Sequence, residues 1–199
     1  MSGESAGVSS RRLESTRAGE RLRDLLAERS FRTGEFTLSS GRTSRYYVDC
    51  RTTTMHAEGQ ALLGQVGVDR LDAAGLWPDL VGGMTMGADP ISYAVAGESW
   101  RRGREPIDAF SVRKEAKGHG TGRRIEGCFE EGRRAVIAED VITTGGSALD
   151  ACRAVESAGG EVMAVLVLVD REEGGRERLE EEGYRVLPLY TAGELEAAL

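Results

Sequence analysis

The sequence predicts an α/β protein with a mostly parallel central sheet and helices on both faces. From residue 79 onward, short apolar segments alternate regularly with helical stretches, which is typical of such a sheet. Loops rich in glycine, acids or bases follow several of the apolar segments. Because ligands of parallel sheets bind beyond the carboxyl ends of the strands, we expect these loops to share one edge.

The first quarter of the chain departs from this alternation. Residues 1–12 are small and polar, which predicts a flexible tail, and apolar residues at helical spacing predict a helix over 13–30. Glycine and serine followed by aromatic residues in 31–51 predict short strands with a turn around 39–42. A helix over 57–75 is predicted next, and it ends at Gly75.

The alternation then runs to the C-terminus. The predicted strands are 79–83, 107–112, 134–138, 161–170 and 184–190. The predicted helices are 91–102, 148–158, 176–182 and a short terminal helix. Residues 113–132 are rich in charge and glycine and have little apolar periodicity, so they predict a loop.

Composition excludes several classes of protein. Apolar residues make up 40% and charged residues 30% of the chain, a globular balance, and no apolar run approaches the roughly 20 residues that span a bilayer. A net charge of −7 argues against nucleic-acid binding. Three widely spaced cysteines and a polar N-terminus predict reduced thiols in a cytoplasmic protein without a membrane partner.

The segment 139–147, Glu-Asp-Val-Ile-Thr-Thr-Gly-Gly-Ser, joins an apolar strand to a helix. Its glycines permit close approach of the backbone, and the free N–H groups at the start of the helix favour an anion such as phosphate. Glu139 and Asp140 would repel a phosphate, but they suit the hydroxyls of a sugar or a nearby metal ion. The simpler interpretation is a capped helix after an ordinary acidic strand end.

Lysine is rare in this chain, and its placement is informative. Only two of the 26 residues that are Lys or Arg are lysines, and Lys114 and Lys117 lie in the same loop as Arg113 and His119. A charge run is usually a solvated face. Compact ammonium groups among glycines instead indicate a mobile cationic lid, which suits a reaction that expels a polyanion.

These motifs resemble those of a known enzyme family. The acid pair followed by Thr-Thr-Gly-Gly-Ser resembles the phosphoribosyl-diphosphate (PRPP) motif of the type I phosphoribosyltransferases, and Arg-Lys-x-x-Lys-x-His-Gly (113–120) resembles the catalytic loop of the orotate phosphoribosyltransferases. The resemblance covers about 20–190 and implies the type I phosphoribosyltransferase fold with a flexible catalytic loop. It implies a single domain over 13–199, with a small hood mainly in 13–55 and a core over about 56–199.

The resemblance also assigns roles to residues of this chain. Stabilisation of the departing pyrophosphate is assigned to the loop residues Arg113, Lys114, Lys117 and His119. Contacts to PRPP are assigned to those four and to Thr85, Glu139, Asp140, Val141, Ile142, Thr143, Thr144, Gly145, Gly146 and Ser147. Contacts to orotate are assigned to Ser40, Gly41, Thr143 and Arg171.

Two supporting segments match the family less completely. Some relatives have a lysine where this chain has Ser39, and Tyr-Lys where it has Thr85 and Met86. Contacts to the diphosphate would therefore come here from the backbone and from Thr85. Arg171 ends an apolar strand and matches the arginine that pairs with the carboxylate of orotate, a contact that favours planar guanidinium geometry.

The implied reaction converts orotate and PRPP to orotidine 5′-phosphate and pyrophosphate, a step of pyrimidine synthesis. Mg²⁺ is the implied cofactor, held mainly by PRPP with Glu139 and Asp140 nearby and without a dedicated set of protein ligands. A homodimer in which each subunit lends its catalytic loop to its neighbour is also implied. Two alternatives stay open, a phosphoribosyltransferase for another base and a non-catalytic regulator that binds PRPP.

Overall fold

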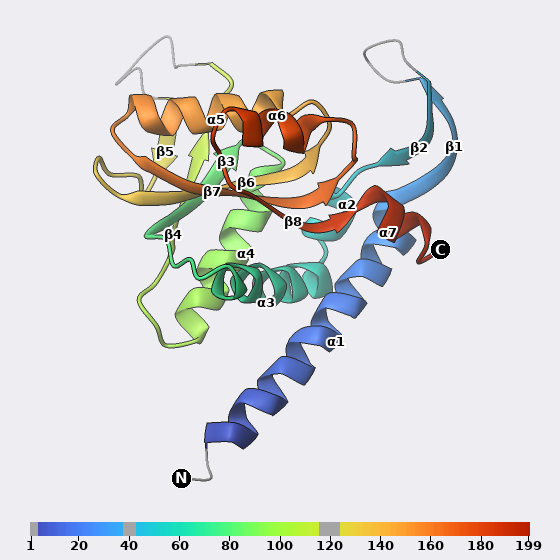
Figure 1. The fold of residues 1–199 in the computed structure, drawn as a ribbon, viewed down its shortest axis with the longest axis horizontal. Coiled ribbons are helices and arrows are strands. Elements are labelled where there is room, and N and C mark those ends of the chain that lie inside the picture. Colours follow the sequence, from blue (N-terminus) through green and yellow to red (C-terminus); the bar gives the residue numbers. More distant parts are fainter. Residues whose placement is uncertain (1–3, 38–42, 116–123) are drawn as a thin grey trace.

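The computed structural model describes residues 4–37, 43–115 and 124–199. In these parts of the chain a six-stranded sheet forms the centre, in the order β5-β4-β3-β6-β7-β8, and a separate two-stranded ribbon stands beside it (Figure 1). All strands of the central sheet are parallel except β5, which pairs antiparallel with β4. The predicted α/β class is confirmed.

The elements follow the predicted order along the chain. The strands are β1 Phe31–Thr37, β2 Thr43–Val48, β3 Leu80–Met84, β4 Asp108–Val112, β5 Ile125–Gly127, β6 Arg134–Ile142, β7 Glu161–Asp170 and β8 Val186–Thr191. The helices are α1 Glu4–Ser30, α2 Arg51–Thr54, α3 Ala57–Ala73, α4 Ala88–Arg101, α5 Gly146–Ser157, α6 Gly175–Glu181 and α7 Ala192–Glu196.

Alternation of side chains along the central strands divides the core into two layers. On β6, Val136 and Ala138 pack with α3 and α4 on one face of the sheet. Ala135 and Ile137 pack with α5 on the other face. Figure 1 shows the two layers on opposite sides of the sheet. Because both faces are covered, the carboxyl ends of the strands are the natural place for a ligand.

The ribbon of β1 and β2, which we call the hood, stands beside the carboxyl edge of the sheet (Figure 1). The strands are antiparallel and carry an irregularity between Thr33 and Phe36. Short strands were predicted in this segment and are confirmed, whereas the predicted turn at 39–42 lies outside the described residues. The long helix α1 leads into the hood and buries Leu22 and Leu26 against the core.

The clearest departures from the prediction are two boundaries and two short elements. β6 continues to Ile142, so Glu139 and Asp140 belong to the strand rather than to a loop. The reason is the length of β7, which supplies parallel partners as far as the pair of Ile142 with Asp170. The short elements α2 and β5 were not predicted, because they are too short for periodicity to reveal. Helix α1 begins at Glu4, within the predicted tail.

Among the described helices, none has the length and apolar character that would let it cross a bilayer.

Candidate active site

The acidic pair lies at the carboxyl end of the central strand β6. Glu139 is only 7% exposed, and its Oε2 atom has no hydrogen-bond partner among the described residues. Burial, and then the charge of Asp140, raise the pKa of Glu139 to about 8. Burial also raises the pKa of Asp140, whose Oδ1 accepts a hydrogen bond of 2.9 Å from the backbone N–H of Val141. Buried acceptors without donors are costly, and such an arrangement indicates a ligand that supplies hydroxyl donors.

The loop after β6 forms an anion cradle. Gly145 has a φ of +73° and is the N-cap of α5, and a Cβ atom there would lie 2.8 Å from the carbonyl oxygen of Gly175. No side chain caps the helix, so its first N–H groups face outward without a side-chain acceptor. A cavity of about 320 Å³ opens here, lined by Glu139 and by residues 141–147. Its size and its amide donors suit a phosphate group.

A second cavity of about 460 Å³ shares Glu139, Val141 and Ser147 with the first. Its lining residues come from the segment between β2 and α2, the β3–α4 loop, the residues after β4, the end of β6 and the start of α5. They are Tyr47, Val48, Asp49, Cys50, Arg51, Met84, Thr85, Met86, Gly87, Lys114, Glu139, Asp140, Val141 and Ser147. The two adjoining cavities therefore place carboxylates between an anion cradle and a lysine.

The β3–α4 loop packs tightly against the acidic pair. A Cβ atom on Gly87 would lie 2.5 Å from Oδ1 of Asp140, so only glycine fits there without displacing the carboxylate. The hydroxyl of Thr85 donates a hydrogen bond of 2.6 Å to Oδ2 of Asp89. The peptide bond between Thr85 and Met86 is cis. Residues of this loop line the larger cavity next to Asp140.

The predicted cationic lid is described only at its base. Arg113 follows β4, its backbone N–H donates to the carbonyl oxygen of Arg124, and its Nε lies 3.1 Å from Oε1 of Glu126. Lys114 is exposed and lines the larger cavity. Lys117 and His119 lie outside the described residues. The base of the loop thus stands at the cavity, and the roles of the four basic residues stay predictions.

Arg171 joins the hood to the core. Its side chain is only 7% exposed, and its Nη2 lies 2.7 Å from Oε1 of Glu173 and donates a hydrogen bond of 3.2 Å to the hydroxyl of Ser44. The guanidinium lies 4.9 Å above the ring of Tyr46, and the hydroxyl of Tyr46 donates to the carbonyl oxygen of Arg171. Its buried Nε atom has no hydrogen-bond partner among the described residues, so the guanidinium keeps a donor for a ligand.

Comparisons with known proteins agree with this geometry. No protein-family model matches the chain. The orotate phosphoribosyltransferase of Aquifex aeolicus (strain VF5) is 46% identical over 179 residues, which span 88% of this chain and 96% of that protein. The chain belongs to the orotate phosphoribosyltransferase family.

Solved structures extend the match to the fold. Orotate phosphoribosyltransferase of Mycobacterium tuberculosis H37Rv in complex with Fe(III) dicitrate is 42% identical, with a TM-score of 0.78 over 89% of this chain and 98% of that one. The same protein in complex with PRPP matches with a TM-score of 0.75 at 38% identity, over 90% of this chain and 99% of that one. The type I phosphoribosyltransferase fold predicted from the motifs is thereby confirmed.

Several residues at the site of this family member were not predicted from the sequence. Tyr46 contacts Arg171 through both its ring and its hydroxyl, and Asp89 accepts hydrogen bonds from two hydroxyls near the cavity. Cys50 is buried under the acidic pair, its thiol donates to the carbonyl oxygen of Asp140, and burial raises its pKa. No local pattern marks these residues, because their partners come from distant segments. Ser40 and Gly41 lie outside the described residues.

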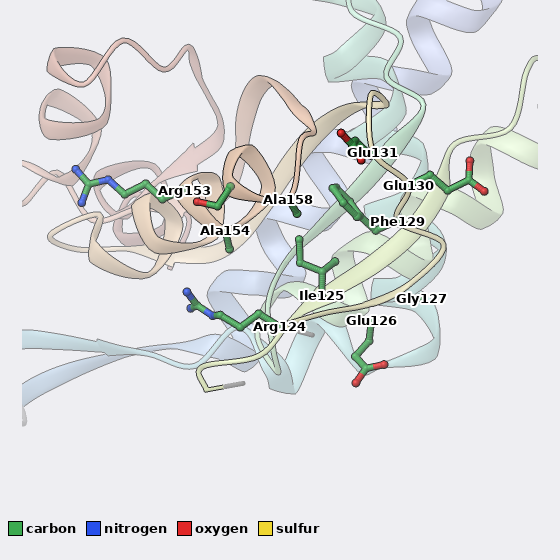
Figure 2. A pocket seen from close by; sticks show the side chains of 11 residues that line it. Arg124, Ile125, Glu126, Gly127, Phe129, Glu130, Glu131, Arg153, Ala154 and Ala158 are labelled. Atoms are coloured by element: carbon green, nitrogen blue, oxygen red, sulfur yellow. The ribbon is translucent and has the colours of Figure 1, made fainter. Parts of the chain in front are cut away.

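A larger cavity, about 780 Å³, lies elsewhere, between β5, the following loop and α5 (Figure 2). Arg124 and Arg153 stand at one end of it, and Glu130 and Glu131 at the other (Figure 2). Both arginines have acidic partners on neighbouring elements, Asp150 and Glu182 respectively. None of the predicted site residues lines this cavity, so volume alone does not identify the active site.

Proposed function

We propose that this chain transfers the 5-phosphoribosyl group from PRPP to orotate, giving orotidine 5′-phosphate and pyrophosphate in pyrimidine synthesis. The observation that carries the proposal is the pair of adjoining cavities at the carboxyl edge, where buried carboxylates separate an anion cradle from a lysine. The orotate phosphoribosyltransferase of Mycobacterium tuberculosis, with the same fold, is in complex with PRPP, which supports PRPP as the ligand of these cavities.

The site offers a partner for each part of PRPP. The ribose hydroxyls donate to the carboxylate of Asp140 and to that of Glu139, whose Oε2 has no hydrogen-bond partner among the described residues. The 5′-phosphate occupies the smaller cavity, held by N–H groups and hydroxyls of the segment 141–147. The diphosphate reaches the larger cavity, toward the β3–α4 loop with Thr85 and toward Lys114.

In the reaction the bond between C1′ and the diphosphate oxygen breaks, and N1 of orotate forms a bond to C1′ from the opposite face. Positive charge builds on the ribose ring as the diphosphate leaves with the bonding electrons. Arg113, Lys114, Lys117 and His119 stabilise the negative charge of the departing pyrophosphate and exclude water. One lost donor of this type costs a factor of about 10² to 10³ in turnover.

Orotate is held at the junction of hood and core. Arg171 faces its carboxylate, and the carboxylate of Glu173, 2.7 Å from Nη2, already occupies the kind of contact that a ligand carboxylate would make. Thr143 approaches orotate from the cradle, and Ser40 and Gly41 approach it from the hood. A neutral base needs no cationic partner, so Arg171 favours orotate over a purine or uracil.

Mg²⁺ fits the chemistry of the acidic pair, because carboxylate oxygens are hard donors and Glu139 keeps an unpartnered oxygen. The described residues contain no group of three or more His, Cys, Asp and Glu side chains placed to hold a metal ion. PRPP would therefore supply most of the ligands, with Glu139 and Asp140 nearby. When bound, Mg²⁺ neutralises the diphosphate and makes it a better leaving group.

We also propose a cytoplasmic homodimer in which each catalytic loop serves the neighbouring site. The surface of α4 supports the dimer. This helix exposes Tyr93 and Trp100, with Trp100 73% exposed, and Met86 is exposed just before it. Aromatic side chains so exposed are typical of an interface. The three cysteines are free thiols, in keeping with a reducing compartment. Sedimentation at micromolar concentration tests the dimer.

An absorbance assay of orotate consumption with PRPP and Mg²⁺ tests the proposed reaction. We expect turnover with orotate and a far lower kcat/KM with uracil, adenine or hypoxanthine. Turnover of a purine in preference to orotate would establish the alternative base specificity. Binding of PRPP without turnover of any base would establish the non-catalytic regulator.

A further inference from the structure

Asp89 accepts two short hydrogen bonds from segments that are distant in sequence. It lies in the first turn of α4 and is half-buried. Its Oδ2 accepts from the hydroxyl of Thr85 at 2.6 Å, and its Oδ1 accepts from the hydroxyl of Ser111 at 2.6 Å. Both carboxylate oxygens are therefore occupied, one by the β3–α4 loop and one by strand β4.

These contacts connect the two backbone segments that flank the diphosphate end of the larger cavity. The backbone N–H of Thr85 also donates to the carbonyl oxygen of Val112 at 2.9 Å, next to Ser111 on β4. Strand β4 ends at Val112, and Arg113 and Lys114 follow directly. The position of the loop relative to the first basic residues of the lid is therefore fixed around one carboxylate.

The orientation of Asp89 also decides what the loop offers to a ligand. An acidic side chain in the first turn of a helix often interacts with the free N–H groups there. In α4, however, no side chain caps the helix at Gly87, and Asp89 accepts from Thr85 and Ser111 instead. The hydroxyl of Thr85 has donated its one proton to Asp89, so it presents only lone pairs to the cavity. The donors for a diphosphate here are therefore Lys114 and those backbone N–H groups of the loop other than that of Thr85, whose directions depend on the position of the loop.

We infer that Asp89 is a positioning residue for the diphosphate of PRPP, acting through Thr85 and Ser111 rather than by touching the ligand. The inference rests on the proposed function. On the side of the loop that faces the acidic pair, Gly87 packs against the carboxylate of Asp140 and limits the movement of the loop. Loss of Asp89 releases one side of the loop while the acidic pair and the 5′-phosphate cradle stay in place.

The test compares Asp89→Ala and Asp89→Asn with the wild-type chain, with Asp108→Asn at the exposed start of β4 as the control. We expect Asp89→Ala to raise the KM for PRPP and the Kd for pyrophosphate with Mg²⁺ by about tenfold, the range for hydrogen bonds to a charged group. The KM for orotate stays within about twofold, since the loop does not face that base. Asp89→Asn keeps one acceptor oxygen, so it recovers part of the loss.

A double-mutant cycle with Thr85→Val separates positioning from general stability. If Asp89 acts through Thr85, the fold-increase in the Kd for pyrophosphate in the double variant is smaller than the product of the fold-increases in the two single variants. A lower Tm with unchanged Kd for pyrophosphate, or equal increases in the KM for PRPP and for orotate, overturns the inference. A wild-type chain that binds pyrophosphate but does not consume orotate contradicts the proposed reaction, while the pyrophosphate titrations still test Asp89.

Discussion

Acidic side chains lie at both ends of the central sheet, in opposite electrostatic environments. At the amino end, Asp79 accepts hydrogen bonds from the backbone N–H, Nε and Nη2 of Arg134 at 2.9, 3.2 and 2.9 Å. These bonds lower the pKa of Asp79 to about 2. At the carboxyl end, burial and a neighbouring acid raise the pKa of Glu139 to about 8. One end satisfies its acid internally, and the other leaves acceptors for a ligand.

The difference shows where this fold gives up stability for binding. A paired acid such as Asp79 contributes to folding, whereas a buried acid pair without cations opposes it. Two cationic side chains of the described residues line the cavity beside the pair, namely Arg51, which is hydrogen-bonded to Asp49, and Lys114, and both are exposed. Four substitutions test whether the two ends differ in this way.

The largest effect is expected from Asp140→Asn. The amide keeps the acceptor for the N–H of Val141 but removes the charge that faces the ribose hydroxyls, so kcat/KM for PRPP falls by about 100-fold. The free energy of unfolding does not fall, because burial disfavours the charged form of Asp140 and the amide removes that charge. Steady-state kinetics and urea denaturation at pH 7.5 measure both quantities. Wild-type activity in this variant would separate Asp140 from the substrate.

Glu139→Gln should change the pH dependence of stability. The folded pKa of Glu139, about 8, lies above its ordinary value of 4.5, so the folded state binds more protons than the unfolded state between these pH values. Wild-type stability therefore falls as pH rises from about 4.5 to 8, and glutamine removes this contribution, on the order of 3 kcal/mol. Urea denaturation at pH 5 and pH 8 measures it. Equal pH slopes in both proteins would contradict the shifted pKa.

Gly87→Ala should impair binding of PRPP more than folding. The added methyl would lie 2.5 Å from the carboxylate of Asp140, which must then move, and we expect the KM for PRPP to rise about tenfold. Gly19→Ala in α1 is the control, since its methyl would meet only the hydroxyl oxygen of Tyr190 at 3.9 Å. Equal KM values for the two variants would show that the loop adapts freely.

The smallest effect is expected from Asp79→Asn, with the opposite pattern. The pKa of Asp79 is lowered from 3.8 to about 2, so its contribution is complete above about pH 4 and is lost as pH falls toward 2. Because Arg134 is nearly half exposed, we expect a loss of only about 1 kcal/mol at pH 7 and unchanged turnover. Thermal denaturation at pH 7 and pH 3 checks it. A loss of turnover would show that the two ends are coupled.

Much of the fold could be predicted because its signals are local. The strand from 161 to 170 and the helix ended by Gly75 follow from apolar runs and a C-terminal glycine, and both are confirmed. The end of β6 was wrong by four residues, since the strand continues as far as its neighbour β7 supplies partners. Strand length in a sheet is a property of the pair, which a single segment does not contain.

The candidate site divides in the same way. The positions of Glu139, Asp140 and Gly145 at the carboxyl edge could be predicted from residue types and spacing, while their roles toward a sugar and a phosphate stay predictions. Asp89 and Tyr46 could not, because their importance depends on contacts with Ser111 and Arg171. Lys117 and His119 remain predictions from the sequence.

By itself, the sequence determined the α/β class, the order of the elements and the family, since apolar periodicity and loop motifs are written along the chain. Only the tertiary structure decided which acids are satisfied and which are left for a ligand. Asp79 and Asp140 are both aspartates of one sheet, the first directly before β3 and the second near the end of β6. Arg134 donates hydrogen bonds to Asp79 and lowers its pKa. Gly87 packs against the carboxylate of Asp140, and burial raises the pKa of that acid. Both Arg134 and Gly87 lie far in sequence from the acid that they contact.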